Sequence, residues 1–492
     1  MTKKIFNVVK WLVYAIQFMC SIAFVYLLYS IELVPMNYII ILGVVLGLLF
    51  IGEYFLIFCK KPKNKRSVIT QLLSLVLSGI LIVGCFYVYK MGQVVDLLGS
   101  ESFQTRAISV IVLKESEIRN ERSLPHHNLG YISSIDKETM SYATKKIQKN
   151  VEDITLSDYT DFSKMVNALY SKKVDGIILD EAFRTLVDQQ KKTFEKDTRV
   201  IYQVTQKGNA VSSKSVDVTK KPFLVYISGN DEYGAISAVS RSDVNVLAAV
   251  NPVTHQVLLL SIPRDTYYPL HRNGQMDKFT HAGIYGLQES INTLQDILKE
   301  DINYYGKMNF TSFMNIIDAI GGITVYSPES FVTKIGHYQI HKGENKLNAK
   351  QALGFVRERK SFSDGDFARG RNQQRMISAV VKKLCSPAIL TSFSSVLDTI
   401  SKSVETNFST AEINALVQMQ LSDMPSWDIQ SYQIEGIPMR KPCYSSGGIN
   451  ASVVVPNQES IDQARKYIDD LMAYKIIKTK DGNLNENKRD HN

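Results

Sequence analysis

Long apolar stretches dominate the first ninety residues of the chain. Residues 11–31 and 67–89 contain no charged side chain, and residues 37–59 contain only Glu53. Each stretch has about the 20 residues that a helix needs to cross the hydrocarbon of a bilayer. A cleaved signal peptide has one short apolar core, so three long stretches exclude that interpretation. The pattern predicts a membrane anchor of three transmembrane helices over residues 1–92.

Basic residues flank these stretches unevenly. Three lysines precede the first stretch, and five basic residues occupy positions 60–66, between the second and the third. The loop between the first and second stretches contains no Lys or Arg. Because basic residues concentrate in cytoplasmic loops, we expect the N-terminus and residues 60–66 to be cytoplasmic. The chain from about residue 91 onward is then predicted to lie outside the cell membrane.

Shorter apolar runs follow over residues 93–206. Runs at 107–113, 176–179 and 200–204 are typical of strands, and the periodicity at 138–148, 162–169 and 182–190 is typical of helices. No pattern typical of a catalytic site interrupts them. We predict a small α/β accessory domain, separated from the rest by a polar linker at 207–221.

A larger domain is predicted over residues 222–478. Apolar, β-branched runs at 223–228, 244–250 and 257–262 predict strands that are buried on both faces, which requires helices on both sides of a sheet. Helical periodicity recurs at 282–299, 310–320, 349–358, 372–384, 388–403, 411–420 and 458–473. The fold class is therefore α/β, with an α–β–α sandwich and a polar tail at 479–492 that we expect to be disordered.

The net charge of +9 is compatible with a nucleic-acid partner, but its distribution argues against one. Residues 1–90 hold nine basic and two acidic residues, a net of +7, so the other 402 residues carry only 9 − 7 = +2. The basic excess lies next to the membrane spans, and no nucleic acid is expected as a partner. Only Cys385 and Cys443 lie beyond the spans, so the sequence has no CxxC zinc site there. One disulfide between these two cysteines is possible.

Arginines and carboxylates cluster at the predicted ends of strands. Asp231 follows the first strand of the larger domain, Arg241 and Asp243 precede the second, and Arg264 follows the third. Strand ends are where α/β proteins place ligands. Guanidinium groups bind phosphate through paired donors, and the two aspartates could share one Mg²⁺ beside it. Any single Arg–Asp pair would more often be a loop salt bridge, but several clusters at element boundaries favour a phosphate site.

The run from residue 357 to residue 373 adds four arginines interleaved with carboxylates, RERKSFSDGDFARGRNQ. Because this phosphate chemistry follows a membrane anchor, we predict that a lipid presents the phosphate. Fixed arginines and Mg²⁺ would stabilise the charge that grows on a departing phosphate. A sugar hydroxyl acceptor needs a base, and Asp366 or another carboxylate of the site could serve.

Six segments, in this order, resemble the LytR–CpsA–Psr family over about residues 223–385: ISGNDEYG, SRSDVN, NPVTHQVLLLSIPRD, DKFTHAG, DAIGGITV and RERKSFSDGDFARGRNQ. The three spans and the small domain resemble its streptococcal CpsA-type capsule-biosynthesis branch. The resemblance implies a phosphotransferase that moves capsular polysaccharide from polyprenyl pyrophosphate to peptidoglycan and releases polyprenyl phosphate. It also implies an apolar tunnel for the prenyl tail, and it is compatible with contacts to other capsule-assembly proteins.

The resemblance further implies roles for individual residues. Mg²⁺ ligands would be Asp231 and Asp243. Catalytic residues would be Arg241, Arg264, Arg359, Asp366 and Arg369. Pyrophosphate would be bound by Arg241, Arg264, Lys278, Arg357, Arg359, Arg369, Arg371 and Gln373. The chain departs from many relatives at Asn372, where they carry an arginine.

Three other functions remain open on the sequence. The same site with water as acceptor would be a polyprenyl-pyrophosphate phosphatase, and a scaffold would need no site arginine. A membrane-bound transcriptional attenuator is a third, but the short predicted cytoplasmic segments have no room for a helix-turn-helix. Phe310, Phe313, Met314 and Ile317 could line the tunnel, although their helical spacing is equally typical of a core.

Overall fold

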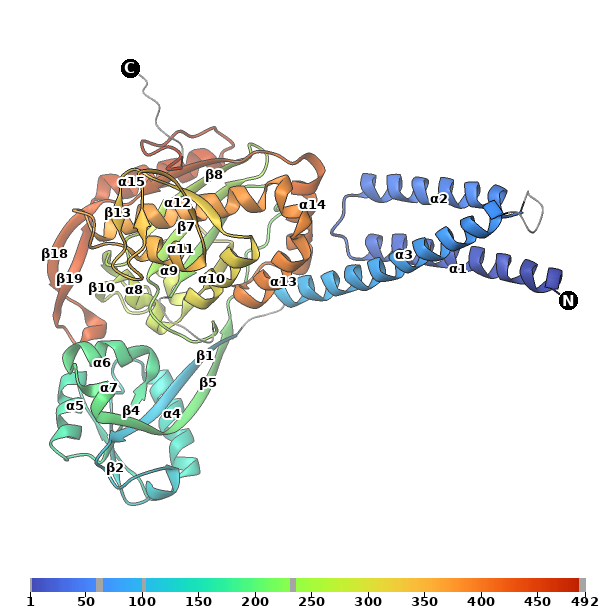
Figure 1. The fold of residues 1–492 in the computed structure, drawn as a ribbon. Coiled ribbons are helices and arrows are strands. Elements are labelled where there is room, and N and C mark those ends of the chain that lie inside the picture. Colours follow the sequence, from blue (N-terminus) through green and yellow to red (C-terminus); the bar gives the residue numbers. More distant parts are fainter. Residues whose placement is uncertain (1, 59–64, 100–102, 231–235, 486–492) are drawn as a thin grey trace.

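The computed structural model describes residues 2–58, 65–99, 103–230 and 236–485 of the 492-residue chain. Figure 1 shows a helical bundle on one side, a large α/β domain beside it and a small α/β domain below the large one. The α/β fold class with an N-terminal helical anchor, as predicted from the sequence, is confirmed.

In the described ranges, three helices are long and apolar enough to cross a membrane: α1 (Thr2–Ser30), α2 (Met36–Phe58) and α3 (Lys65–Leu98). The predicted spans fall within or close to these helices, but α3 continues nine residues beyond Tyr89. Lys10, in the N-terminal half of α1, donates a hydrogen bond from Nζ to the carbonyl of Ile57 at 2.8 Å and so connects α1 to α2.

The small domain is a five-stranded sheet in the order β3-β2-β4-β1-β5. Its strands are β1 (Phe103–Leu113), β2 (Asn128–Tyr131), β3 (Thr155–Asp158), β4 (Gly176–Asp180) and β5 (Thr198–Ala210). Helix α4 (Lys137–Asn150) covers one face, and α5 (Phe162–Tyr170) with α6 (Arg184–Gln190) covers the other. β2 and β3 have four residues each, too few for the sequence to show an alternation, and they were not predicted.

The large domain contains a described six-stranded sheet in the order β16-β11-β6-β7-β8-β17. Its strands are β6 (Phe223–Gly229), β7 (Val244–Asn251), β8 (Gln256–Ser261), β11 (Tyr304–Met308), β16 (Glu405–Thr406) and β17 (Asp428–Gln433). Alternate residues face opposite sides: Leu247 packs under α9 (Leu287–Leu298) and α15 (Gln458–Met472), whereas Val246 packs towards α12 (Asp366–Leu384). Helices therefore cover both faces, which confirms the predicted α–β–α arrangement.

The remaining elements surround this sandwich. They are α8 (Phe279–Ala282), α10 (Phe310–Ala319), α11 (Ala349–Arg357), α13 (Phe393–Ser403) and α14 (Thr410–Asp423), with the two-stranded ribbons β9 (Tyr267–Pro269)–β10 (Met276–Lys278), β12 (Ile323–Ser327)–β15 (Gly343–Leu347), β13 (Phe331–Val332)–β14 (Gln339–Ile340) and β18 (Gly436–Pro442)–β19 (Asn450–Pro456).

Several element boundaries differ from the sequence expectation. The helix expected at 388–403 starts only at Phe393, after a 3-10 helix at Pro387–Thr391. The helix expected to start at residue 282 is interrupted by Gly286, whose φ of 113° no helix accommodates, so α9 starts at Leu287. α12 starts at Asp366 instead of Asn372. Residues 479–485, expected in a disordered tail, instead lie along β17, where Thr479 donates to the carbonyl of Ser431 at 2.6 Å.

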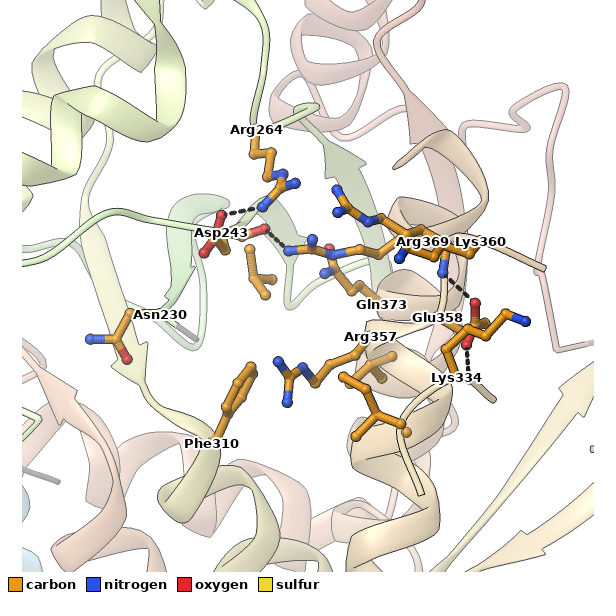
Figure 2. A pocket seen from close by; sticks show the side chains of 15 residues that line it. Asn230, Asp243, Arg264, Phe310, Lys334, Arg357, Glu358, Lys360, Arg369 and Gln373 are labelled. Atoms are coloured by element: carbon orange, nitrogen blue, oxygen red, sulfur yellow. Dashed lines mark hydrogen bonds and ion pairs between the residues drawn. The ribbon is translucent and has the colours of Figure 1, made fainter. Parts of the chain in front are cut away.

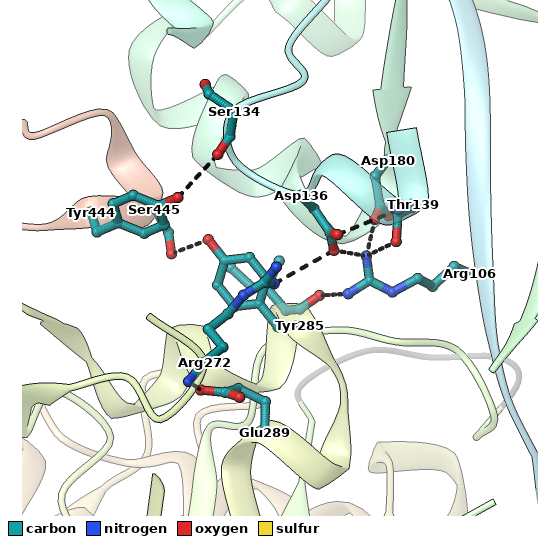
Figure 3. A network of polar contacts seen from close by, with 11 residues as sticks. Arg106, Ser134, Asp136, Thr139, Asp180, Arg272, Tyr285, Glu289, Tyr444 and Ser445 are labelled. Atoms are coloured by element: carbon teal, nitrogen blue, oxygen red, sulfur yellow. Dashed lines mark hydrogen bonds and ion pairs between the residues drawn. The ribbon is translucent and has the colours of Figure 1, made fainter. Parts of the chain in front are cut away.

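A buried ion-pair network joins the small domain to the large one (Figure 3). Arg106 of β1 is 8% exposed and contacts the carboxylates of Asp136 at 3.0 Å and Asp180 at 2.6 Å. The same guanidinium donates across the domain boundary to the carbonyl of Ile284 at 2.5 Å. Arg272 of the large domain lies 3.6 Å from Asp136. The two domains thus contact each other through this buried arginine, and Val239 and Ile284 of the large domain pack into a core of the small domain.

We expect Arg106→Leu to loosen the small domain. It would leave two carboxylates buried without their cation, and breaking a buried pair in this way costs about 3–5 kcal/mol. Hydrogen exchange in the full-length protein should show faster exchange of the β1 and β4 amides. The exposed Arg119→Leu serves as the control, and equal exchange in both variants would contradict a structural role for the network.

Candidate active site

Three strand ends meet at one edge of the large sheet. β6 runs antiparallel to β7 so that Gly229 pairs with Val244, and β7 pairs with β8 so that Val246 lies opposite Ser261. The residues just beyond these pairs, Asn230, Asp243 and Arg264, therefore come together although they are far apart in sequence. This is the edge at which the sequence predicted a phosphate site.

A cavity of about 290 Å³ lies at this edge (Figure 2). Its described lining comprises Asn230, Asp243, Val244, Arg264, Phe310, Lys334, Ile335, Gly354, Val356, Arg357, Glu358, Arg359, Lys360, Arg369 and Gln373. Six of these side chains are cationic and two are carboxylates. The excess of positive charge makes the cavity suited to a polyanion.

Asp243 organises two of the arginines. Its Oδ1 lies 2.8 Å from Nη1 of Arg264, and its backbone carbonyl accepts from Nη2 of Arg369 at 2.9 Å. Burial lowers the pKa of Arg264, but the carboxylates of Asp243, Asp366 and Asp265 outweigh this and raise the pKa above its ordinary value. Arg264 therefore stays charged although it is largely enclosed.

Asp366 lies among three guanidinium groups. Its carboxylate is 3.7 Å from Arg264, 3.8 Å from Arg359 and 3.7 Å from Arg369. These distances are longer than direct hydrogen bonds, so Asp366 balances the charge of the three arginines without a direct hydrogen bond to any of them.

The early start of α12 sets which side chains reach the cavity. Asp366, Arg369 and Gln373 recur at helical spacing and share the face that points to the cavity. Arg371 lies on another face and pairs with Asp364 at 2.5 Å. At Gly370 a Cβ atom would lie 2.1 Å from Nε2 of Gln433, so the glycine permits α12 to pack closely on the sheet.

The end of α11 supplies two further contacts. The guanidinium of Arg357 lies 4.2 Å from the ring centroid of Phe310, which holds it by a cation–π contact. Glu358 is 3% exposed and accepts from the backbone amides of Lys334, Arg359 and Ser361, the last two at 3.1 and 3.0 Å. Glu358 thus fixes the two loops that carry Lys334 and Arg359.

Other predicted site residues lie elsewhere or outside the described ranges. Arg241 is half-buried and is not among the described lining residues, and Lys278 pairs with Asp265 at 3.0 Å. Asp231 follows Asn230 in sequence and lies outside the described residues. Asn372 is 2% exposed, and its side-chain oxygen accepts a hydrogen bond from Nη1 of Arg375 at 2.9 Å, away from the arginines that line the cavity.

An apolar cavity of about 80 Å³ adjoins the cationic one. Asn230, Val244, Phe310, Val356 and Gln373 line both, so the two share one wall. The apolar cavity adds these side chains from the sheet, α10, α11 and α12: Ile227, Met308, Phe313, Leu353, Met376 and Ile377. Of the four α10 residues weighed as tunnel lining, Phe310 and Phe313 line this cavity, whereas Ile317 and Met314 pack in the core.

A model of the LytR_cpsA_psr family matches residues 181–468, which is more than half of the chain. The chain belongs to the LytR–CpsA–Psr family. Its relatives include the polyisoprenyl-teichoic acid–peptidoglycan teichoic acid transferase TagU of Bacillus subtilis (strain 168), 34% identical over 220 residues that cover 44% of this chain and 66% of the relative. TagU of Bacillus anthracis (strain A0248) is 35% identical over 226 residues, 46% of this chain and 71% of the relative.

Solved structures of the family align with part of the chain. The crystal structure of B. subtilis TagV aligns at a TM-score of 0.44 with 27% identity, over 52% of this chain and 99% of TagV. The alignments with curated LytR–CpsA–Psr relatives span about two thirds of the relatives' length.

Sequence analysis missed Asn230, Lys334, Glu358 and Lys360. Asn230, Glu358 and Lys360 lie inside segments that resemble the LytR–CpsA–Psr family, so proximity to the motif arginines was the available signal for them. Lys334 lies in the loop between β13 and β14, outside every such segment. Only the folded arrangement of this ribbon over the cavity reveals Lys334.

The residues at the sheet edge suit a Mg²⁺ ion. Asp243 offers a carboxylate, and the Oδ1 of Asn230 is buried without a hydrogen-bond partner in the described chain, while its Nδ2 donates to Ser240 at 2.8 Å. Mg²⁺ binds few protein oxygens and completes its shell with water and phosphate.

We expect the contribution of Glu358 to stability to depend on pH. Burial raises the pKa of Glu358, but the amides of Lys334, Ser361 and Arg359 outweigh it and hold the pKa below the ordinary 4.5. A lowered folded pKa means that the stabilisation is complete above about pH 4.5 and is lost as the pH falls through the folded pKa.

Glu358→Gln should therefore lower the melting temperature at pH 7, through the loss of about 2 kcal/mol of charged hydrogen bonding, and this deficit should shrink as the pH falls through the folded pKa of Glu358. Thermal unfolding from pH 3.5 to pH 8 measures this, with the exposed Glu344→Gln as control. A difference in melting temperature between Glu358→Gln and the wild type that stays constant with pH would contradict a lowered pKa of Glu358.

Proposed function

We propose that the chain transfers a glycopolymer from polyprenyl pyrophosphate to a hydroxyl of peptidoglycan and releases polyprenyl phosphate. The observation that carries this proposal is the position of the cationic cavity directly beside the apolar one. A lipid pyrophosphate has the same two-part character, a polyanion attached to a hydrocarbon chain. The TagU relatives, whose names describe polyisoprenyl-linked donors and peptidoglycan acceptors, support the same class of reaction.

In the proposed reaction the hydroxyl oxygen attacks the phosphorus that carries the polymer. A new P–O bond forms to peptidoglycan, and the bridging P–O bond to polyprenyl phosphate breaks. The hydroxyl proton passes to a carboxylate, for which we propose Asp366, because Asp366 lies beside the arginines that would hold the phosphates. Arg264, Arg359 and Arg369 stabilise the charge that develops on the leaving phosphate.

Asn230 and Asp243, together with Asp231, are the proposed Mg²⁺ site. Bound there, Mg²⁺ would neutralise part of the pyrophosphate charge. We propose capsular polysaccharide as the polymer, on the resemblance of the anchor and small domain to the CpsA branch. Teichoic acid, which the names of the TagU relatives give, is the alternative cargo.

Water in place of the sugar hydroxyl would turn the same site into a pyrophosphatase. Product analysis separates the two: transfer gives peptidoglycan fragments with polymer attached, and hydrolysis gives free polymer phosphate. A preparation that yields only free polymer phosphate in the presence of peptidoglycan fragments would replace the transferase by the phosphatase.

We also propose that the two α/β domains face the outside of the cell membrane. The large domain contacts the loop between α1 and α2, which carries no basic residue. Basic residues instead flank the opposite ends of the helices. A reporter fused after Lys478 should be active only outside the cytoplasm, and cytoplasmic activity would overturn this orientation.

Replacement of the site arginines by lysine should slow transfer without unfolding the protein. Lysine keeps the charge of Arg264 or Arg369 but cannot form two parallel hydrogen bonds to phosphate. Loss of one such contact, about 3–4 kcal/mol in the transition state, predicts a fall in rate on the order of 10²–10³. The assay follows polymer transfer from a lipid-linked donor to peptidoglycan fragments.

The matched control for these variants is Arg440→Lys, at an exposed position on β18. Thermal unfolding is measured alongside the rates. If the site variants transfer at the wild-type rate, or lose activity only because they unfold, the arginines are structural and the proposed function fails.

The metal hypothesis predicts that Asp243→Asn and chelation have similar effects. Loss of several kcal/mol of charge stabilisation should reduce transfer at least about a hundredfold. Added Mg²⁺ should restore the chelated wild type but not the variant, and the exposed Asp462→Asn should behave as wild type. Full activity in excess chelator would refute a role for the metal.

A further inference from the structure

Helix α14 lies against the loop that joins α1 to α2 (Figure 1). Nδ2 of Asn414 donates to the carbonyl of Ile31 at 3.0 Å, Nε2 of Gln418 donates to the carbonyl of Glu32, and the hydroxyl of Tyr38 donates to the carbonyl of Leu421 at 3.4 Å. Because α1 ends and α2 begins at this loop, the loop marks one face of the membrane. α14 therefore lies at the level of that face.

Helix α13 is attached to the same end of the bundle by apolar contacts. Leu397 forms a buried cluster with Leu33 of the loop and with Val95 and Leu98 of α3. Phe393 and Ile400 of α13, with Ile413 and Val417 of α14, pack against this cluster. The α13–α14 pair is thus joined to the membrane helices by both hydrogen bonds and apolar packing.

The surface of α14 is unusual for a water-exposed helix. Residues 413–422, INALVQMQLS, contain no charged side chain, and only Glu412 and Asn414 of the helix are buried. A helix on the surface of a soluble domain normally carries a charged face. A half-exposed run of ten uncharged residues, next to the ends of membrane spans, fits the boundary between headgroups and hydrocarbon.

An apolar cavity of about 220 Å³ opens between these helices. It is lined by Leu384, Cys385, Ser386, Ile389, Phe393, Val396, Leu397, Ile400, Leu416, Val417, Gln420, Leu421 and Met424. None of these side chains is charged. Burial raises the pKa of Cys385 to about 11, so its thiol is neutral at physiological pH. Several lining residues, Phe393, Val417 and Leu421 among them, are only half-buried, so the cavity reaches the surface.

We propose that this cavity binds one acyl chain of a phospholipid from the outer leaflet. Its level at the end of the spans supplies the hydrocarbon, and its uncharged lining offers nothing to a pyrophosphate, unlike the cavity at the sheet edge. The bound chain holds the α13–α14 face in the membrane boundary. This inference takes the leaflet from the proposed orientation of the chain and does not rest on the proposed transfer reaction.

The test uses the full-length chain in nanodiscs of phosphatidylglycerol that carries a diazirine on its acyl chain. After irradiation, peptide mapping by mass spectrometry should find adducts within residues 384–424 as well as within the three spans. Val417→Trp, which fills the cavity, should reduce the 384–424 adducts at least about fivefold and leave the span adducts unchanged. Val253→Trp, at a position 55% exposed in the turn after β7, is the matched control and should label as wild type.

Thermal unfolding checks each variant, and Leu421→Trp repeats the test if Val417→Trp does not fold. Three outcomes overturn the proposal. The first is labelling that is confined to the spans, and the second is labelling of 384–424 that does not change when the cavity is filled. The third is labelling of 384–424 by a diazirine polyisoprenyl phosphate that excess phosphatidylglycerol does not compete away, since that would assign the cavity to the carrier lipid.

Discussion

Mutual repulsion among cations is the constraint that shapes the large domain. The described wall of the cationic cavity brings six cationic side chains together, and nearby carboxylates counter their repulsion. Asp243 holds Arg264 by a direct ion pair and Arg369 through its carbonyl, while Asp366 stays at 3.7–3.8 Å from three arginines. Asp243 therefore positions two guanidinium groups by direct contacts, and Asp366 adds negative charge near three of them without a direct hydrogen bond.

This arrangement depends on the sheet beneath it. The antiparallel pairing of β6, β7 and β8 brings Asn230, Asp243 and Arg264 to one edge, and α12 begins over the same edge with Asp366. Gly370 permits the close packing that sets the height of α12 above the strands. The site is therefore built on regular elements, whose packing fixes side chains more precisely than loops do.

Much of the fold could be predicted because its central elements are long and strongly patterned. The spans and the strands β6, β7 and β8 are continuous apolar runs, and the α–β–α arrangement follows from strands buried on both faces. Short strands such as β2 and β16 could not be predicted, because four residues or fewer are too few to show the two-residue period of a strand or the 3.6-residue period of a helix. The start of α12 was missed because its first turn, Asp366 to Arg369, is polar, and its face points to the cavity instead of a core.

The residues of the site also differ in whether a sequence pattern could predict them. Arg264, Arg359 and Arg369 lie together because motif residues at strand and helix ends converge in this fold. Lys334 was beyond prediction, since its position depends on how the β13–β14 ribbon folds over the cavity. Arg371 was predicted, like Arg369, to bind pyrophosphate, but two residues along a helix turn a side chain by about 200°, away from the site.

The contact of α14 with the loop after α1 gives the large domain a second attachment to the membrane, in addition to the chain that leaves α3. A domain on a single tether tumbles, and each encounter with a membrane-bound molecule must stop that rotation again. Two attachments remove most of the rotational freedom once, when the protein folds. The orientational entropy that a lipid-borne ligand would otherwise lose on binding is then largely lost in advance, and diffusion in the plane of the bilayer alone is left to bring the two together.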